Sequence, residues 1–456
     1  MEARLRETEQ DVGRRHRLAW GQAYRLVVML LLLVLLAVPA MAAKARNVIL
    51  FIGDGMGPSQ VSLAALYSKE IQKRPLRMLD AAAAGRMGIA YTSSANALVT
   101  DSAAAATALA TGFKTNNGVI GLDAEGKRVP TILELARDRG LRTGLVATAS
   151  ITHATPAGFA AHVSSRGSEF EIAAQMADAR IDVLLGGGLG FFRPKDQGGE
   201  RTDGQDLVER LRAAGCSVLS TRQELADSTA PRMVGLFGSG ALSPAFLRER
   251  DAPGQPRLAE MTDQAIRALA RGKRGFFLMV EGSQIDWRCH ANEAVGALHE
   301  VLELDEAVGV ALDFARRRRD TLVLVTADHE TGGMTLTAGG EQLQALAKAA
   351  LPLDAAGLAN GMTAAQIAAL TAEKLSLPVP EAEIGGLLGP TGAFDQKAHG
   401  LPLLRLMGGR CGVSWTTTGH TATPVYLIGY GPGSERIQGV QENTATFTIM
   451  RRALGL

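Results

Sequence analysis

The sequence predicts an α/β protein, a three-layer α/β/α sandwich built on a mostly parallel central sheet. Short apolar runs of strand length recur along the chain, and stretches of helical composition separate them. Polar side chains follow directly after several apolar runs, as in open parallel sheets that bind ligands at the carboxyl ends of their strands. The chain has 456 residues and 46% hydrophobic content, enough for a large core, so a disordered protein is excluded.

The predicted strands are continuous apolar runs, as expected for strands that are buried on both faces. They span residues 47–52, 141–147, 181–185, 276–280, 321–326 and 425–428. The main helices predicted between them are rich in alanine, leucine and arginine and span 131–139, 258–271 and 291–317. This alternation of strands and helices favours a parallel sheet with helices on its faces.

The first segment, 1–43, is predicted to be a secretory signal peptide. Four arginines within 14–25 precede an apolar run at 26–38, and Ala40-Met41-Ala42 supplies small residues at the spacing of a cleavage site. A retained membrane anchor is the alternative, but the apolar run is short against the ~20 residues of a helical span. We therefore expect an exported protein, periplasmic or extracellular, with no stable membrane association after cleavage.

The remainder, 44–456, is predicted to be one catalytic domain. Within it, 338–409 is rich in Ala, Leu, Gly and Pro and holds few candidate catalytic groups, so we expect an insertion outside the main sheet, helical at 363–375. Removing six arginines and four acidic residues of the signal from the 48 basic and 46 acidic residues leaves 42 of each. Net charge therefore gives no reason to expect binding to nucleic acid or acidic membranes.

The cysteines are three in number, Cys216, Cys289 and Cys411. An odd number cannot be fully paired within one monomer. Small buried thiols are the simpler interpretation for all three, and export leaves one disulfide as the alternative.

Four of the eight histidines fall in short polar loops beside acids or hydroxyls. They are His153, His290, His329 and His420. Any one alone would be interpreted as a structural histidine, but together they indicate a metal site. Asp286 and His290 are four residues apart, which places both on one face of a helix. Zinc accepts both ligand types.

Two further loops supply metal ligands at predicted strand ends. Asp328-His329 follows one strand, and Asp54 follows the first strand with a carboxylate that could bridge two cations. With Asp286, His290 and His420, the chain offers three carboxylates and three imidazoles. This set suits two catalytic zinc ions with open positions.

The candidate nucleophile is Ser102, which precedes an alanine-rich helical run at 103–111. At a helix N-terminus, backbone amides and the macrodipole favour an anion. A zinc ion at the serine oxygen would favour the alkoxide. A simple helix cap, formed by Asp101 or Ser102, is an equally good interpretation of this window alone.

In the stretches that contain these residues, the chain resembles the alkaline phosphatase family. The resemblance extends in the family's order across nearly all of the mature chain, and six windows together make it specific. These windows are 47–57, 99–112, 152–166, 280–292, 326–333 and 417–424. The resemblance implies the α/β/α sandwich, which agrees with the fold expected from the strand and helix pattern.

The resemblance also implies roles for the matching residues. Asp286, His290 and His420 are implied as ligands of the first zinc, and Asp54, Asp328 and His329 as ligands of the second. Asp54, Thr155 and Glu281 are implied as ligands of a third metal, usually Mg²⁺. Ser102 is implied as the serine that becomes phosphorylated, and Arg166 as the arginine that holds two phosphate oxygens, a task that suits a planar fork.

Two positions differ among members of the family. His153 stands where some members have aspartate, and an imidazole there could shift the third site from Mg²⁺ toward Zn²⁺ or Co²⁺. Trp287 stands where others have lysine or histidine, and it lacks their positive charge near bound phosphate. We expect weaker binding of product phosphate, and faster turnover if product release limits the rate.

The predicted function is hydrolysis of phosphate monoesters at alkaline pH through a phosphoserine, with broad specificity for small molecules, in a homodimer. One alternative is another enzyme on the same fold, a phosphodiesterase, sulfatase or phosphomutase. Sulfatases resemble one another in a Cys/Ser-x-Pro-x-Arg pattern at the nucleophile. The residues that follow Ser102 do not match this pattern. A second alternative is a non-catalytic protein that binds phosphate or metal.

Overall fold

The structure is a computed structural model that describes residues 20, 29, 44–337, 339–349 and 357–456. The chain divides into two units, Met1–Ala43 and Lys44–Leu456. Nearly all of the predicted signal peptide lies outside the described residues, so it stays a prediction. Among the residues that are described, no helix combines the length and the apolar character needed to cross a bilayer.

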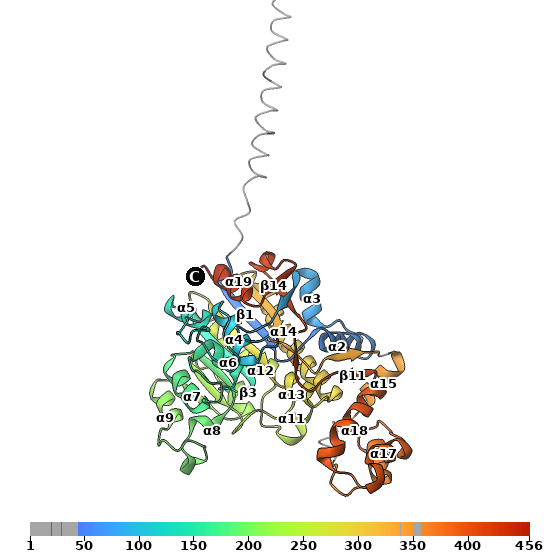
Figure 1. Ribbon diagram of the computed structural model, residues 1–456. Helices are drawn as coiled ribbons and strands as arrows, with labels where there is room; N and C mark the ends of the chain where they lie inside the picture. The colour runs from blue at the N-terminus through green and yellow to red at the C-terminus, as the bar shows by residue number, and fades with distance from the viewer. Residues whose placement is uncertain (1–19, 21–28, 30–43, 338, 350–356) are drawn as a thin grey trace, which may run out of the picture. The chain divides into compact units, whose positions relative to one another are not determined.

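A ten-stranded sheet runs through the unit Lys44–Leu456, with helices on both of its faces (Figure 1). The strand order is β14-β2-β13-β8-β1-β7-β3-β4-β6-β5. Neighbouring strands are parallel, except that β13 is antiparallel to both β8 and β2. In the order of the sheet, the strands span Val440–Glu442, Arg86–Tyr91, Val425–Tyr430, Thr321–Ala327, Asn47–Gly53, Phe276–Gly282, Arg142–Ser150, Val183–Gly187, Met233–Leu236 and Ser217–Leu219. The predicted fold class is confirmed.

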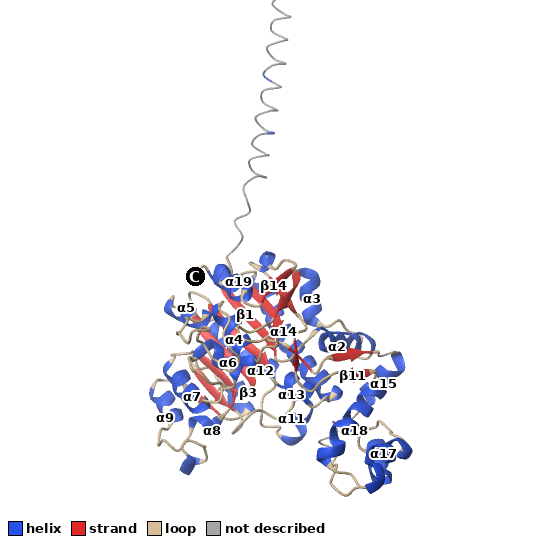
Figure 2. Ribbon diagram, viewed as in Figure 1, coloured by secondary structure: helices blue, strands red, loops and turns tan. Residues whose placement is uncertain are grey.

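The central strands β8, β1 and β7 are buried at every residue, which explains why they read as continuous apolar runs. Alternate side chains enter two cores, with Ile49 and Phe51 in one and Val48 and Leu50 in the other. Figure 2 shows the helical layers on the two faces of the sheet. The first core is completed by α12 (Leu258–Leu269) and α14 (Ala294–Arg318), and the second by α5 (Ile132–Asp138), α6 (Ala154–Ala160) and α19 (Ala445–Leu454).

The helix starts are fixed by capping side chains. In α5, the Thr131 hydroxyl accepts from the Glu134 amide and the Glu134 carboxylate accepts from the Thr131 amide, a capping box. In α14, Glu293 accepts from the amides of Val295 and Gly296. That cap is why α14 begins at Ala294, three residues later than the sequence predicts.

The strands that carry the site end together. Gly53 of β1 lies opposite Gly282 of β7 and Ala327 of β8 in register, and β3 is the next neighbour of β7. The loops that leave these four strands therefore meet at one edge of the sheet.

The segment predicted as an insertion, 338–409, connects β10 (Met334–Leu336) to β11 (Val413–Trp415), which pair antiparallel with each other. Its described residues form helices and contribute no strand to the ten-stranded sheet. The helices are α15 (Gly340–Lys348), α16 (Ala364–Glu373), α17 (Glu381–Leu388) and α18 (Gln396–Arg410).

Candidate active site and metal centre

Asp54 directly follows β1, in a tight loop whose next position, Gly55, requires glycine. Gly55 has φ +72°, and a Cβ there would lie 2.7 Å from the Cα of Asp286. The Gly55 amide donates to Oδ1 of Asp328 at 3.0 Å. Asp54 is thereby held, fully buried, between the segments that follow β7 and β8.

The first cluster contains Asp286, His290 and His420, whose ligand atoms all lie within 4.8 Å of one another. Asp286 and His290 share α13 (Gln284–His290), and His420 comes from β12 (His420–Thr421). Nε2 of His290 is 3.2 Å from Oδ2 of Asp286 and 3.1 Å from Nε2 of His420. The i, i+4 spacing has brought both ligand types to one face of the helix, as the sequence predicts.

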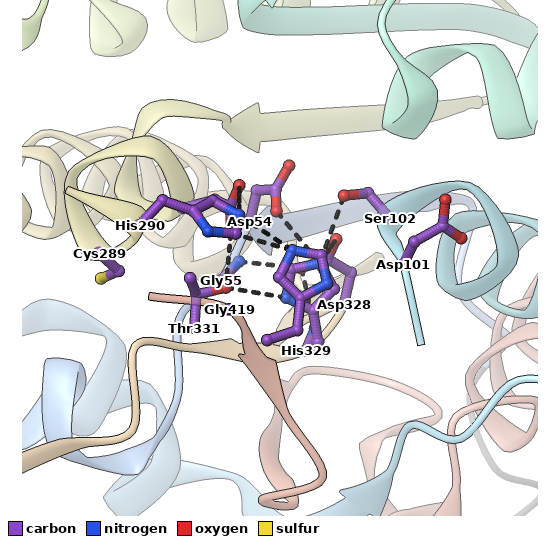
Figure 3. A network of polar contacts seen from close by, with 12 residues as sticks. Asp54, Gly55, Asp101, Ser102, Cys289, His290, Asp328, His329, Thr331 and Gly419 are labelled. Carbon is purple, nitrogen blue, oxygen red and sulfur yellow. Dashed lines mark hydrogen bonds and ion pairs between the residues drawn. The ribbon is translucent and has the colours of Figure 1, made fainter. Parts of the chain in front are cut away.

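The second cluster contains Asp54, Asp328 and His329, again with ligand atoms within 4.8 Å. Nε2 of His329 is 3.2 Å from Oδ2 of Asp328 and 3.6 Å from Oδ1 of Asp54. All three side chains are completely buried. Figure 3 shows Ser102 facing His329, with 3.3 Å between the serine Oγ and Nε2.

The third cluster contains Asp54, Glu281 and His153 within the same 4.8 Å limit. Asp54 is shared with the second cluster. The Thr155 hydroxyl is buried and has no hydrogen-bond partner, and it lies near the Glu281 carboxylate. His153, predicted only as a neighbour of the third metal, thus lies among the potential ligands.

Ser102 is the first residue of α4 (Ser102–Thr111), and Asp101 is its cap, accepting from the Ala104 amide at 3.0 Å. Of the two cap candidates, it is therefore Asp101 that caps the helix. The alanine-rich sequence lets α4 pack closely on α6, because a Cβ at Gly158 would lie 2.8 Å from the Cβ of Ala106. Ser102 is buried with its hydroxyl at the N-terminus of the helix, where an anion is favoured.

The Arg166 guanidinium lies between Asp101, the residue before Ser102, and the third cluster. Nη1 donates to Oδ2 of Asp101 at 3.1 Å, and Nη2 is 3.2 Å from Nε2 of His153. The His153 ring meets the Trp287 ring edge to face, with centroids 5.8 Å apart. The side chain of Arg166 is 32% exposed, so the guanidinium can reach a bound anion.

The tautomers of two imidazoles follow from their partners. Nδ1 of His290 faces the Thr418 carbonyl at 2.5 Å, and Nδ1 of His420 faces the Thr100 carbonyl at 2.9 Å. A carbonyl only accepts hydrogen bonds, so in both rings Nδ1 carries the proton. Nε2 of each ring is therefore the nitrogen left to bind a metal ion, and it faces the first cluster.

The residues fit metal ions. Both oxygens of Asp54 and of Glu281, and Oδ2 of Asp328, are buried without a hydrogen bond of normal geometry. Burial, and then the charges of three neighbouring carboxylates, raise the pKa of Asp54 well above its usual range, and burial raises the pKa of Glu281 to about 8. Bound cations would compensate this buried negative charge and reverse those shifts.

Some contributors to the site were not predicted from the sequence. The Thr331 hydroxyl donates to the Asp286 carboxylate. The Gln60 amide donates to the Glu330 carboxylate and to the Thr331 carbonyl. Glu330 directly follows a predicted ligand pair, which is a weak local signal. Gln60 has no such signal, because its contacts are more than two hundred residues away in the chain.

The fold and the site define a hydrolase with metal-binding clusters on an α/β/α sandwich, since histidines and carboxylates surround a buried serine at the strand ends. The family model described as alkaline phosphatase matches residues 45–456. The chain therefore belongs to the alkaline phosphatase family and is a phosphatase.

Relatives and solved structures agree with this membership. The chain is similar to alkaline phosphatase 4 of Bacillus subtilis, with 38% identity over 90% of this chain and 89% of that protein. Alkaline phosphatase of Escherichia coli is 33% identical over 90% of this chain and 86% of that protein. The Thermus thermophilus alkaline phosphatase structure superposes with a TM-score of 0.82 and 31% identity, covering 92% of this chain and 93% of that one.

A further solved relative contains a metal ion. A histidine-to-aspartate mutant of the alkaline phosphatase from the Antarctic bacterium TAB5 was solved with Mg bound in its M3 site. That chain is 32% identical, with a TM-score of 0.67 over 91% of this chain and 99% of that one.

Proposed function

We propose that this phosphatase hydrolyses small phosphate monoesters at alkaline pH, with Ser102 as the nucleophile and a phosphoserine as the intermediate. The observation that carries the proposal is the position of the Ser102 hydroxyl. It lies at the N-terminus of α4, within 3.3 Å of Nε2 of His329 in the second cluster. The alkaline optimum rests on the family alone.

The clusters indicate which residues would hold the metal ions. The first would hold one Zn²⁺ and the second another, while Asp54, Thr155 and Glu281 would hold Mg²⁺, or Zn²⁺ or Co²⁺ because His153 is adjacent. When bound, these ions supply Lewis-acid stabilisation of the charge on the phosphoryl, nucleophile and leaving-group oxygens.

The protein's own residues bind and orient the phosphoryl group. Arg166 donates to two of its oxygens, and Asp101 holds the guanidinium in place for this task. Ser102 Oγ attacks phosphorus, and the bond from phosphorus to the ester oxygen breaks, which releases the alcohol. Water then attacks the phosphoserine, so that inorganic phosphate leaves and the serine hydroxyl is restored.

Trapping of the intermediate tests the proposal. The metal-loaded enzyme is incubated with radioactive phosphate, quenched in acid and mapped by peptide. We expect label on the peptide containing Ser102, no label in Ser102→Ala, and turnover reduced by about a thousandfold or more in that variant. The exposed Ser164 is the matched control, and Ser164→Ala keeps the label. Full labelling and turnover in Ser102→Ala would refute the assignment.

The phosphodiesterase alternative is tested at Arg166. A phosphate monoester has three non-bridging oxygens and a diester has two, so only the monoester can offer two oxygens to the arginine fork and a third to the metal centre. Arg166→Ser is therefore expected to lower turnover of p-nitrophenyl phosphate far more than that of bis(p-nitrophenyl) phosphate. An equal loss on both, with the diester preferred by the wild type, supports a diesterase.

We further propose that the enzyme is a homodimer. An apolar surface, here called the β2 patch, lies on β2, its neighbour β14 and the loops beside α4. Its side chains are 38–82% exposed: Met87, Ile89, Tyr91, Leu98, Val99, Phe113 and Val440. Val440 is paired with Ile89 across the two strands, and the Ala95 amide donates to the Thr115 carbonyl, which joins the loops. A second copy of this chain would cover the patch.

The dimer is tested by sedimentation equilibrium of the mature chain. We expect a dimer in the wild type and a monomer after the double substitution Ile89→Lys and Val440→Lys.

Export is tested separately, by fractionating cells that express the full chain. The expected results are activity in the periplasm or medium and a mature chain that begins near position 44.

A further inference from the structure

The Thr331 side chain lies between the two clusters proposed to bind zinc. It belongs to β9 (Glu330–Thr331) and is completely buried. Its Oγ1 is 2.5 Å from Oδ1 of Asp286 in the first cluster and 3.2 Å from Nδ1 of His329 in the second. One hydroxyl therefore contacts a potential ligand of each metal.

The direction of each hydrogen bond follows from the chemistry of the partners. An ionised carboxylate only accepts, so the single Thr331 proton goes to Asp286. The hydroxyl oxygen then has only lone pairs to offer His329, and Nδ1 of that ring must be the donor. Nε2 of His329 is then the nitrogen left to bind a metal ion, and it is the atom that faces Ser102 and Asp328.

His329 depends on this hydroxyl in a way that the other two imidazoles do not. Backbone carbonyls set the tautomers of His290 and His420. Within the described part of the chain, Nδ1 of His329 has one hydrogen-bond partner, the Thr331 hydroxyl, which by itself can donate or accept. Asp286 removes that ambiguity by taking the proton.

The Thr331 main chain is fixed on both sides. Its amide donates to the Gly55 carbonyl at 3.2 Å, and its carbonyl accepts from Nε2 of Gln60 at 2.9 Å. It is also paired with His420 across β12 and β9. Because threonine is stiff at χ1, a fixed main chain also fixes the hydroxyl.

We propose that Thr331 is a positioning residue that couples the two metal sites: its hydroxyl orients Asp286 for the first metal and fixes the His329 tautomer for the second. The inference rests on the proposed use of these clusters as metal sites. A partner that orients a ligand typically changes metal affinity by about 10- to 100-fold when it is removed. Here a single deletion reaches both sites.

Metal titration gives the first test. Zinc affinities are measured by competition with a chromophoric chelator for the wild type, Thr331→Val, which keeps the shape without the hydroxyl, and Thr331→Ser, which keeps the hydroxyl. We expect Thr331→Val to weaken both sites by about 10- to 100-fold and Thr331→Ser to stay within a few-fold of the wild type.

The matched control is Thr262→Val. Thr262 is equally buried and bonds the Leu258 carbonyl at 2.7 Å, within α12 and outside the site. This variant should lower thermal stability without changing zinc affinity. Wild-type zinc affinity at both sites in Thr331→Val would overturn the proposal, as would a loss at one site only.

Nitrogen NMR of isotope-labelled histidine in the zinc-loaded wild type gives the second test and requires no variant. We expect His329 to bind the metal through Nε2 and to carry its proton on Nδ1, and metal bound through Nδ1 would overturn the proposal. Trapping of the phosphoserine reports separately on the proposed function. Absence of label together with the expected tautomer and affinities would refute the catalytic proposal and leave the Thr331 inference standing.

Discussion

In the proposed site, single residues around the phosphoryl group would set how tightly it is held, and Trp287 is the clearest case. Its ring lies edge to face with His153, which in turn contacts Arg166. It adds no charge beside the guanidinium. A cation at this position would add an attraction to the phosphate dianion that the tryptophan cannot supply.

Trp287→Lys should therefore strengthen inhibition by inorganic phosphate. One added charge a few ångströms away contributes on the order of 1 kcal/mol in a solvated site, which corresponds to a roughly fivefold lower inhibition constant. Turnover should fall if phosphate release is limiting. Inhibition constants for the wild type, Trp287→Lys and the uncharged control Trp287→Phe check this. Unchanged or weaker inhibition in the lysine variant would count against it.

Asn292 is a single residue that joins three segments next to the first cluster. It has φ +55° and is completely buried. Its Nδ2 donates to the carbonyls of Cys289 and Thr417, and its Oδ1 accepts from Nε of Arg405 on α18. The inserted helices are thus bonded to the end of α13, which carries His290, and to the segment just before His420.

Two substitutions separate the backbone contribution of Asn292 from its hydrogen bonds. Asn292→Ala loses the bonds and places an alanine in the left-handed region, and we expect a loss of about 2–4 kcal/mol in the free energy of unfolding. Asn292→Gly loses the same bonds without the backbone penalty and should be about 1 kcal/mol more stable than the alanine variant. Urea denaturation measures both, and the reverse order would contradict this account.

At the scale of elements, helix α5 carries a pH-dependent cap. Glu134 is its N3 residue, and it also contacts His162 and Arg128, at 3.2 and 2.5 Å. Burial opposes ionisation, but these contacts and the Thr131 amide outweigh it and lower the pKa of Glu134 to about 2. Because the folded pKa is depressed, the stabilisation is present above the unfolded value of about 4.5 and is lost as the pH falls toward 2.

Glu134→Gln should remove this acid-sensitive contribution, about 1 kcal/mol after allowance for solvent screening. The variant should be less stable than the wild type near neutral pH, and the difference should shrink on acidification. Glu224→Gln is the control, since Glu224 closes the corresponding capping box of α10 (Arg222–Asp227) on the surface and should show a smaller effect. Thermal melts across this range check the prediction, and a difference that grows toward low pH would oppose it.

At the scale of the whole molecule, the sequence predicted the centre of the fold better than its edges. The strands β8, β1 and β7 are readable because both faces are buried. The strand β2, next to the edge strand β14, escaped prediction, since Met87, Ile89 and Tyr91 alternate with smaller residues and remain exposed. The antiparallel strand β13 was predicted, but nothing local indicates its direction.

The candidate site was readable for a similar reason. Its ligands follow buried strands or sit at helical spacing, as Asp54 and the pair Asp286 and His290 do. Thr331 was not found, because its significance comes from a contact with Asp286, 45 residues away in the chain. Such contacts depend on tertiary structure and leave no local pattern.

The most direct test of the central claim is hydrolysis of p-nitrophenyl phosphate by the mature chain at alkaline pH. Activity is measured before chelation, after chelation, and after zinc and magnesium are restored. A metal-dependent phosphatase loses activity on chelation and regains it with the metals. A fully metallated protein that does not hydrolyse the monoester would contradict the account.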